Sequence, residues 1–354
     1  MLSNKIKINY TVACVVLGII FVLQKTVLVS DSEIFTNILD FLQWPFLIYI
    51  MSTLVDRKIE KRSLYLYFIA IIALSLFFIS YINSGLANIF KYAVLIVAAH
   101  KNFNMEIFRK FRNTYLYFVI TIFALGLLRI IPSTVVRRGY FTYGFIHVNV
   151  FAMLVLSIIC CDILCSFDRV TFRRGILYTV VITIIMLLTD CRSVAIGYIS
   201  IVMLLILFKF KKNVSNSKII KLGFTILPII LTAISFYVAY NFDISNPMML
   251  TLNKLSSERI YLANQLTRYF SPTLLGQDCG NLLMENSYIT IFFAWGIIPG
   301  CIVLATYCYA IYKSISKRAY GVSVCLLGFA IQGLFEGSAF ELFLNLALLA
   351  TFII

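Results

Sequence analysis

The stretch ILYTVVITIIMLLTDCRSVAIGYISIVMLLILFKF, residues 176–210, decides the fold class of this chain. As one straight helix, residues 176–208 would be about 50 Å long, whereas the hydrocarbon core of a bilayer is about 30 Å thick. A break at TDCRS, residues 189–193, gives two helices instead, and the first would be only about 22 Å long. Because that helix is short, its polar turn lies below the membrane surface. We therefore predict a membrane hairpin with Asp190 and Arg192 recessed at its turn.

The composition of the whole chain agrees with a membrane protein. Of its 354 residues, 61% are apolar and 13% are charged, and the mean hydropathy is +0.95. A soluble domain is about 45–50% apolar and about 25% charged. These values exclude a soluble globular protein, a disordered chain and a small disulfide-rich scaffold. We predict an all-α, polytopic helical bundle that forms one domain over residues 1–354.

The apolar runs predict about twelve membrane spans. They are expected at 9–29, 35–55, 64–82, 87–100, 114–131, 146–166, 176–190, 193–210, 222–241, 287–311, 320–335 and 339–354. The last run is short and carries Glu341 and Asn345, so eleven spans and a packed half-helix are the alternative. One connection, 242–286, is much longer than the others, and a loop of that length is usually functional.

The net charge is +15, and most of the Lys and Arg residues lie in clusters, each of which follows an even number of predicted spans. Positively charged residues between spans favour the cytoplasmic side of the plasma membrane. Both termini are therefore expected in the cytoplasm. A nucleic-acid-binding protein would gather its positive charge on one folded surface. The separate clusters here are topology signals, and no nucleic-acid partner is expected.

Several charged residues remain on the predicted outer side, where the topology signal disfavours cations. The arginines of this outer group are Arg129, Arg137, Arg138, Arg192, Arg259 and Arg268, and the acids are Asp190, Glu258, Glu285 and Glu336. Charges at membrane depth are costly, so those present need partners or a function. Guanidinium groups bind phosphate through two parallel hydrogen bonds. The outer group therefore suggests a site for an anionic substrate reached from outside the cell.

Structural roles are the alternative for these arginines. Arg192 can pair with Asp190 to cap the hairpin. Arg137 and Arg138 can belong to a solvated loop, and Arg259 can lie on the exposed face of an amphipathic helix.

Two further outer positions leave alternatives open. His147, in GFIHVN, is either a packing group or a residue that positions a sugar or phosphate or moves a proton. Asn149 points about 200° away from His147 if the helix has already begun, unless Gly144 keeps the backbone irregular. Glu336 either serves the site or brackets the turn between the last two spans.

No sequence feature indicates a metal or a cofactor. The chain contains no P-loop, no HExxH sequence and no carboxylate-rich DxD motif. Its nine cysteines lie mostly in apolar runs, which favours packing thiols over metal ligands. We expect neither a cofactor nor a metal.

Five motifs in order along the chain resemble one protein family. They are GFIHVN (144–149), TDCRS (189–193), SSERI with SPTLLGQDCG (256–260 and 271–280), MENSYITIFFAWGIIPG (284–300) and the acidic turn at Glu336. Over residues 130–340 this order resembles the bacterial O-antigen polymerase and ligase superfamily, especially the Wzy-type polymerases of capsule and exopolysaccharide. Each motif is weak alone, and the signal comes from their order on a matching topology.

The resemblance implies a metal-independent glycosyltransferase that uses glycans carried on undecaprenyl diphosphate. It implies that Arg192 and Arg259 hold the diphosphate, and we expect Arg137 or Arg138 to assist. For the acceptor hydroxyl, Glu285 and His147 are the catalytic candidates, with Glu285 preferred.

We further expect Asn149, Asn286 and Glu336 to contact the glycan. Ligases carry a histidine before the corresponding asparagine, where this chain has Glu285 before Asn286. That difference favours a polymerase over a ligase.

Three other functions stay open at this point. An O-antigen ligase shares the donor chemistry, a flippase or transporter shares the lipid-linked substrate, and a membrane scaffold would use its arginines only for anionic lipid. The expected partners are undecaprenyl-diphosphate-linked oligosaccharide and membrane lipid. A flippase and a chain-length regulator of the same pathway are further candidates.

Overall fold

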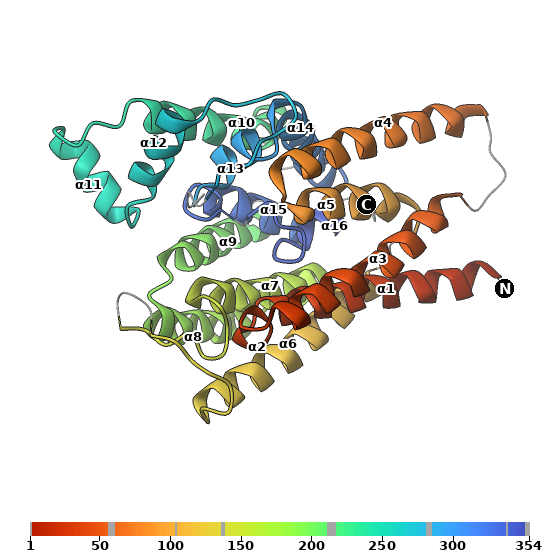
Figure 1. Ribbon diagram of the computed structural model, residues 1–354, viewed down its shortest axis with the longest axis horizontal. Coiled ribbons are helices and arrows are strands. Elements are labelled where there is room, and N and C mark those ends of the chain that lie inside the picture. Colours follow the sequence, from red (N-terminus) through yellow and green to blue (C-terminus); the bar gives the residue numbers. More distant parts are fainter. Residues whose placement is uncertain are drawn as a thin grey trace.

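A computed structural model describes residues 2–55, 61–102, 105–135, 139–210, 217–280, 285–337 and 339–350. These residues form helices and connections, with isolated β-bridges in place of any named strand (Figure 1). The longer helices are α1 (Leu2–Gln24), α3 (Glu33–Val55), α4 (Lys61–Ser84), α5 (Ala87–Asn102), α6 (Glu106–Leu127), α7 (Val148–Ser166), α8 (Phe172–Thr189), α9 (Arg192–Phe210), α10 (Lys218–Tyr240), α14 (Ile297–Ser316) and α15 (Tyr320–Gln332). The shorter ones are α2 (Val27–Ser30), η1 (Phe167–Arg169), α11 (Pro247–Leu255), α12 (Arg259–Tyr269), α13 (Ser287–Phe293) and α16 (Ala347–Ala350).

Six helices of the described ranges are long and apolar enough to cross a membrane. They are Glu33–Ser52, Val148–Arg169, Phe172–Thr189, Arg192–Phe210, Lys218–Tyr240 and Ile297–Ser316. Shorter apolar helices occur at Tyr10–Gln24, Phe68–Ser84, Asn88–Val97 and Tyr320–Gln332. The predicted all-helical membrane character is confirmed, whereas the count of twelve spans is not.

Helices α7 and α15 form the centre of the bundle. Nearly every residue of α15 is buried, and α15 packs against α7, α9, α10 and α14. Gly328 permits the close approach of α9, because a Cβ at this position would lie 2.3 Å from the side chain of Ile201. The peripheral helices α3, α8 and α10 instead expose many apolar side chains, which suits contact with lipid.

The predicted hairpin at TDCRS is confirmed. Helix α8 ends at Thr189, Asp190 adopts a left-handed conformation with φ +48°, and α9 begins at Arg192. The Asp190 amide donates to the Met186 carbonyl at 2.8 Å, which closes the last turn of α8. The chain therefore reverses direction within two residues.

The expected single span at 287–311 is wrong, because the helix is interrupted between α13 and α14. Gly296 has φ +99°, and a Cβ there would lie 2.2 Å from the amide nitrogen of Gly276. The loop that carries Gly276 packs into the break, where the Ile297 amide donates to the Thr273 carbonyl at 2.8 Å. A local glycine with a positive φ and contacts from a remote loop together divide this apolar run.

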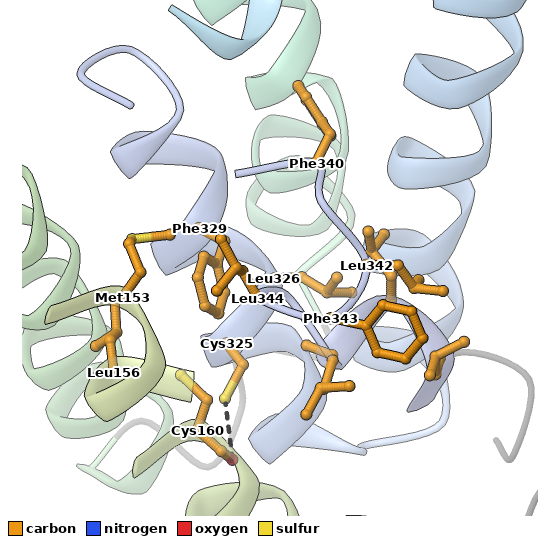
Figure 2. Packing of buried hydrophobic residues seen from close by; sticks show 14 of the residues in the cluster. Met153, Leu156, Cys160, Cys325, Leu326, Phe329, Phe340, Leu342, Phe343 and Leu344 are labelled. Carbon is orange, nitrogen blue, oxygen red and sulfur yellow. Dashed lines mark hydrogen bonds between the residues drawn. The ribbon is translucent and has the colours of Figure 1, made fainter. Parts of the chain in front are cut away.

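The expected span at 339–354 is also wrong over its described part. Residues 339–346 are buried but non-helical, and only α16 follows. Figure 2 shows Phe340, Leu342, Phe343 and Leu344 along this irregular segment. The Phe340 ring packs against Tyr288 and Tyr307, and the Phe343 ring packs against Phe21 and Phe111. Tyr115 donates to the Phe343 carbonyl at 3.0 Å, and Ser157 donates to the Leu344 carbonyl. Irregular backbone is tolerated at membrane depth because protein side chains satisfy its polar groups.

The long predicted loop 242–286 contains two helices, α11 and α12. Figure 1 shows them at one end of the molecule, with the turn between α8 and α9 at the same end and the N-terminus at the opposite end. We call the first of these the loop end. At the far end, Lys209 near the end of α9 donates a hydrogen bond to the Val170 carbonyl just before α8.

Candidate functional site

A cavity of about 510 Å³ opens at the loop end of the bundle. Four segments that are far apart in the sequence meet around it. The lining residues are Tyr140, His147, Val148, Asn149, Thr189, Asp190, Cys191, Arg192, Ser257, Glu258, Arg259, Leu262 and Glu285. The cavity therefore combines the start of α7, the α8–α9 turn, the start of α12 and the approach to α13.

Five of the sequence-predicted site residues line this cavity together. They are His147, Asn149, Arg192, Arg259 and Glu285. Glu336 lies against them but outside the lining, and Asn286 serves the cap of α13. Arg137 and Arg138 lie outside the described residues.

Arg259 is the anchor of the site, and its side chain is only 11% exposed. It begins α12 directly after Ser257 and Glu258, which both adopt left-handed conformations. Its Nε donates to Glu285 Oε2 at 2.8 Å, and its Nη2 lies 3.6 Å from Glu336 Oε2. The structural alternative, in which Arg259 lies on the exposed face of an amphipathic helix, is therefore wrong. The Arg259 guanidinium therefore links the long loop to Glu285, which precedes α13, and to Glu336, which follows α15.

Glu336 connects three helices beneath the cavity. Its Oε2 accepts a hydrogen bond from Ser193 of α9 at 3.0 Å and another from Asn149 of α7 at 3.5 Å. With the Arg259 pair, these contacts join α7, α9 and α12 at a carboxylate that is 10% exposed. Glu336 thus contacts Arg259, Ser193 and Asn149, and its expected contact with glycan stays a prediction.

Arg192 is the more accessible of the two described cavity arginines, with a side chain that is 49% exposed. Its Nε donates to Asp190 Oδ1 at 3.3 Å, so the pair named as the structural alternative for Arg192 is present. Arg192 is also the first residue of α9, where the positive end of the helix dipole favours an anion. An anion that enters the cavity meets the exposed guanidinium of Arg192 before the enclosed guanidinium of Arg259.

His147 is the N-cap of α7, and its extended backbone places it before the first helical turn. Its Nδ1 accepts from the Asn149 amide at 3.1 Å, so the neutral ring carries its proton on Nε2. Burial lowers the pKa of His147 below its ordinary value of 6.5. The ring is therefore a neutral hydrogen-bond donor near pH 7, and it is poorly suited to accept a proton at Nε2.

The uncertainty over His147 and Asn149 is resolved by where α7 begins. Gly144 has φ +83°, which keeps the backbone irregular before the helix, and α7 starts at Val148. Helical geometry therefore does not separate the two side chains, and both line the cavity.

Glu285 is one of three carboxylates that line this cavity, with Asp190 and Glu258. Its Oε2 is held by Arg259, and its side chain is 26% exposed. The next residue, Asn286, fixes the local backbone, since its Oδ1 accepts from the amides of Tyr288 and Ile289. Its Nδ2 donates to Ser235 at 3.1 Å and to the Leu334 carbonyl at 3.2 Å. Asn286 therefore fixes the backbone next to Glu285, and its expected contact with glycan stays a prediction.

The described part of the site contains more acids than arginines. Arg192 and Arg259 meet the four acids Asp190, Glu258, Glu285 and Glu336. The arginines are thus paired in this state, and an incoming anion has to compete with Asp190 for Arg192. Sequence reasoning did not anticipate this balance.

Sequence reasoning also missed three contributors to the site. Tyr140 and Ser257 line the cavity, and Ser193 donates to Glu336. Ser193 and Ser257 fall inside motifs already recognised, TDCRS and SSERI, so their neighbours gave a signal. Tyr140 stands in an aromatic run and gave none.

Comparisons with protein-family models, with curated proteins and with solved structures found no match to this chain. Across the described ranges, no three His, Cys, Asp or Glu side chains are grouped closely enough to hold a metal ion. The family suggested by the five motifs therefore stays a prediction.

Proposed function

We propose that this chain is a glycosyltransferase that polymerises lipid-linked glycan repeat units at the outer face of the bacterial plasma membrane. The observation that carries the proposal is the cavity at the loop end, where a guanidinium, a carboxylate and an imidazole converge. These are the groups needed to bind a diphosphate, accept a proton and donate a hydrogen bond. The basic clusters, which the positive-inside rule assigns to the cytoplasm, support an outward-facing loop end and cytoplasmic termini.

In the proposed reaction, an acceptor hydroxyl of one repeat unit attacks the anomeric carbon of a glycan on polyprenyl diphosphate. The new bond joins that oxygen to the carbon, and the bond from the carbon to the diphosphate oxygen breaks. The electron pair leaves with the diphosphate, and the hydroxyl proton passes to Glu285. Arg192 stabilises the negative charge that develops on the leaving group.

The other residues position these two groups. Arg259 orients the Glu285 carboxylate through its 2.8 Å hydrogen bond, and Glu336 holds Arg259 from below. His147, as a neutral donor, supplies a hydrogen bond to a sugar hydroxyl or a phosphate oxygen. The proposal thus separates the two arginines, with Arg192 on the diphosphate and Arg259 as a positioning residue.

An O-antigen ligase would use the same donor and the same leaving group. Glu285 at the position where ligases carry histidine favours the polymerase. A flippase would need polar side chains distributed toward the membrane midplane. The polar cavity described here lies at one end of the bundle, which favours transfer chemistry over transport.

The test uses purified protein, undecaprenyl-diphosphate-linked repeat units and a chelator. The wild type should yield a ladder of products. Arg192→Ala and Arg192→Lys should each lower kcat/KM by about 100-fold or more. An ammonium group does not replace the two parallel hydrogen bonds that a guanidinium donates to a phosphate. Arg268→Ala is the matched control, since Arg268 is exposed on α12 outside the cavity lining.

Wild-type ladders from both Arg192 variants would refute the diphosphate role. Transfer to an acceptor lipid without any ladder would identify a ligase instead. Loss of export with intracellular accumulation of repeat units in deletion cells would identify a flippase.

A further inference from the structure

A second large hollow lies on the side of the bundle, between helices α6, α7 and α8. Its volume is about 530 Å³ and its surface is almost wholly apolar. Buried residues of α7, such as Phe151 and Val155, form its floor, and exposed residues such as Ile120 of α6 and Ile184 of α8 form its walls. We call this hollow the side groove.

The side groove runs along the helices for about 16 Å, because each of the three helices lines it from one end to the other over three turns. At the end far from the cavity, Asp162 accepts hydrogen bonds from Arg112 and Tyr178 and closes the groove with a polar cluster. At the other end, the rings of Phe123 and Phe151 stack with centroids 5.1 Å apart. The groove is therefore polar at one end and apolar along the rest.

The apolar end of the side groove adjoins the cavity. Phe151 lies two residues after Asn149, and Leu188 lies one residue before Thr189. Asn149 and Thr189 line the cavity, while Phe151 and Leu188 line the groove. A molecule with an anionic head beside Arg192 and an apolar tail along α7 would occupy both hollows at once.

We infer that the side groove binds the first isoprenoid units of the polyprenyl chain whose diphosphate occupies the cavity. The inference rests on the proposed function and deepens it, because it assigns the lipid of the donor to named helices. Lipid tails and groove are equally apolar, so the groove gains selectivity from packing and not from the hydrophobic effect. Its contribution is to hold the diphosphate in register with Glu285.

Two adjacent valines of α8 provide a matched pair of variants. Val181 lines the groove, whereas Val180 is 49% exposed and lies outside the groove lining. Val181→Trp should raise KM for an undecaprenyl-linked donor about tenfold, which corresponds to about 1.4 kcal/mol. Val180→Trp should leave KM unchanged. With a dimethylallyl-linked donor, whose single isoprenoid unit ends short of Val181, both variants should match the wild type.

Equal KM values for the two valine variants with the undecaprenyl-linked donor would overturn the inference. Failure of the wild type on every donor would instead count against the proposed function. A second measurement on the wild-type protein keeps the two separate and does not depend on activity or on folding of a variant. Undecaprenyl phosphate with a diazirine in its tail should label peptides from α6, α7 and α8.

The competition experiment distinguishes other occupants of the groove. Unlabelled undecaprenyl diphosphate should abolish the labelling, and phosphatidylglycerol should not. Displacement by phosphatidylglycerol would show a groove for bulk lipid. Protection of the groove in a crosslinked pair of chains would show an interface between copies, and either result would overturn the inference.

Discussion

Replacing Arg259 by methionine tests whether the buried ion pairs hold the long loop onto the bundle. The substitution removes the cation that pairs with both Glu285 and Glu336, and it leaves the two carboxylates without that partner. Breaking a buried ion pair by removing one partner costs about 3–5 kcal/mol. The Glu336 pair is the buried one, with side chains 11% and 10% exposed. The more accessible Glu285 contact adds at most about 1 kcal/mol.

A loss of about 4 kcal/mol is a large part of a typical unfolding free energy of about 5–15 kcal/mol. Seven of the nine cysteines are buried, so a thiol-reactive fluorophore in detergent micelles reports unfolding directly. Adding Glu336→Gln to Arg259→Met removes the unpaired buried charge and should recover about 2 kcal/mol. Arg268→Met, on the exposed side of α12, should shift the free energy of unfolding by less than about 0.5 kcal/mol.

The reasoning is refuted if Arg259→Met and Arg268→Met unfold at the same denaturant concentration. It is also refuted if the costs of Arg259→Met and Glu336→Gln simply add in the double variant. Either result would mean that the loop end does not depend on this cluster.

Three further predictions concern single positions. His147 has a lowered pKa in the folded state, so the unfolded state binds more protons below about pH 6.5 and wild-type stability should fall on acidification through that window. His147→Asn keeps a capping acceptor without a titrating group, and a pH series of unfolding midpoints should show its stability unchanged between pH 7 and pH 5. Asn286→Ala should lower the free energy of unfolding by about 2 kcal/mol or more, because it removes a helix cap together with two further hydrogen bonds. Asn286→Asp should retain the cap, and the same unfolding assay compares the two variants. Gly296→Ala should lower the free energy of unfolding by at least about 2 kcal/mol, because the left-handed backbone and the contact with Gly276 both disfavour a Cβ. Gly223→Ala should not destabilise the protein, because the space around Gly223 is open. Equal unfolding midpoints for the two variants would contradict the role of Gly296.

The sequence predicted those features that depend on length and direction along the chain. Residues 176–208 are too long for one membrane crossing, so the hairpin followed from arithmetic. Alternation of the spans then placed His147, Arg192 and Glu285 at the same end, and they do share one cavity. The alternating direction of the spans was therefore enough to predict that these three residues lie at one end of the bundle.

The features that the sequence did not predict depend on contacts between distant segments. The apolar run at 287–311 reads as continuous, and it is broken by a loop that packs Gly276 against Gly296. Residues 339–346 read as a span, because burial inside protein and exposure to lipid select the same apolar side chains. The pairing of Arg259 with two acids required the fold of the long loop, which no local pattern contains.

The buried irregular segment at 339–346 has a consequence for how the protein is built. A membrane helix satisfies its own backbone and can enter lipid alone. This segment cannot, because its carbonyls at Phe343 and Leu344 depend on hydroxyl groups from α6 and α7. We therefore expect it to join the bundle after those helices have assembled. Tyr115→Phe and Ser157→Ala barely change hydropathy, yet they should impair this last step of biogenesis and leave earlier insertion intact.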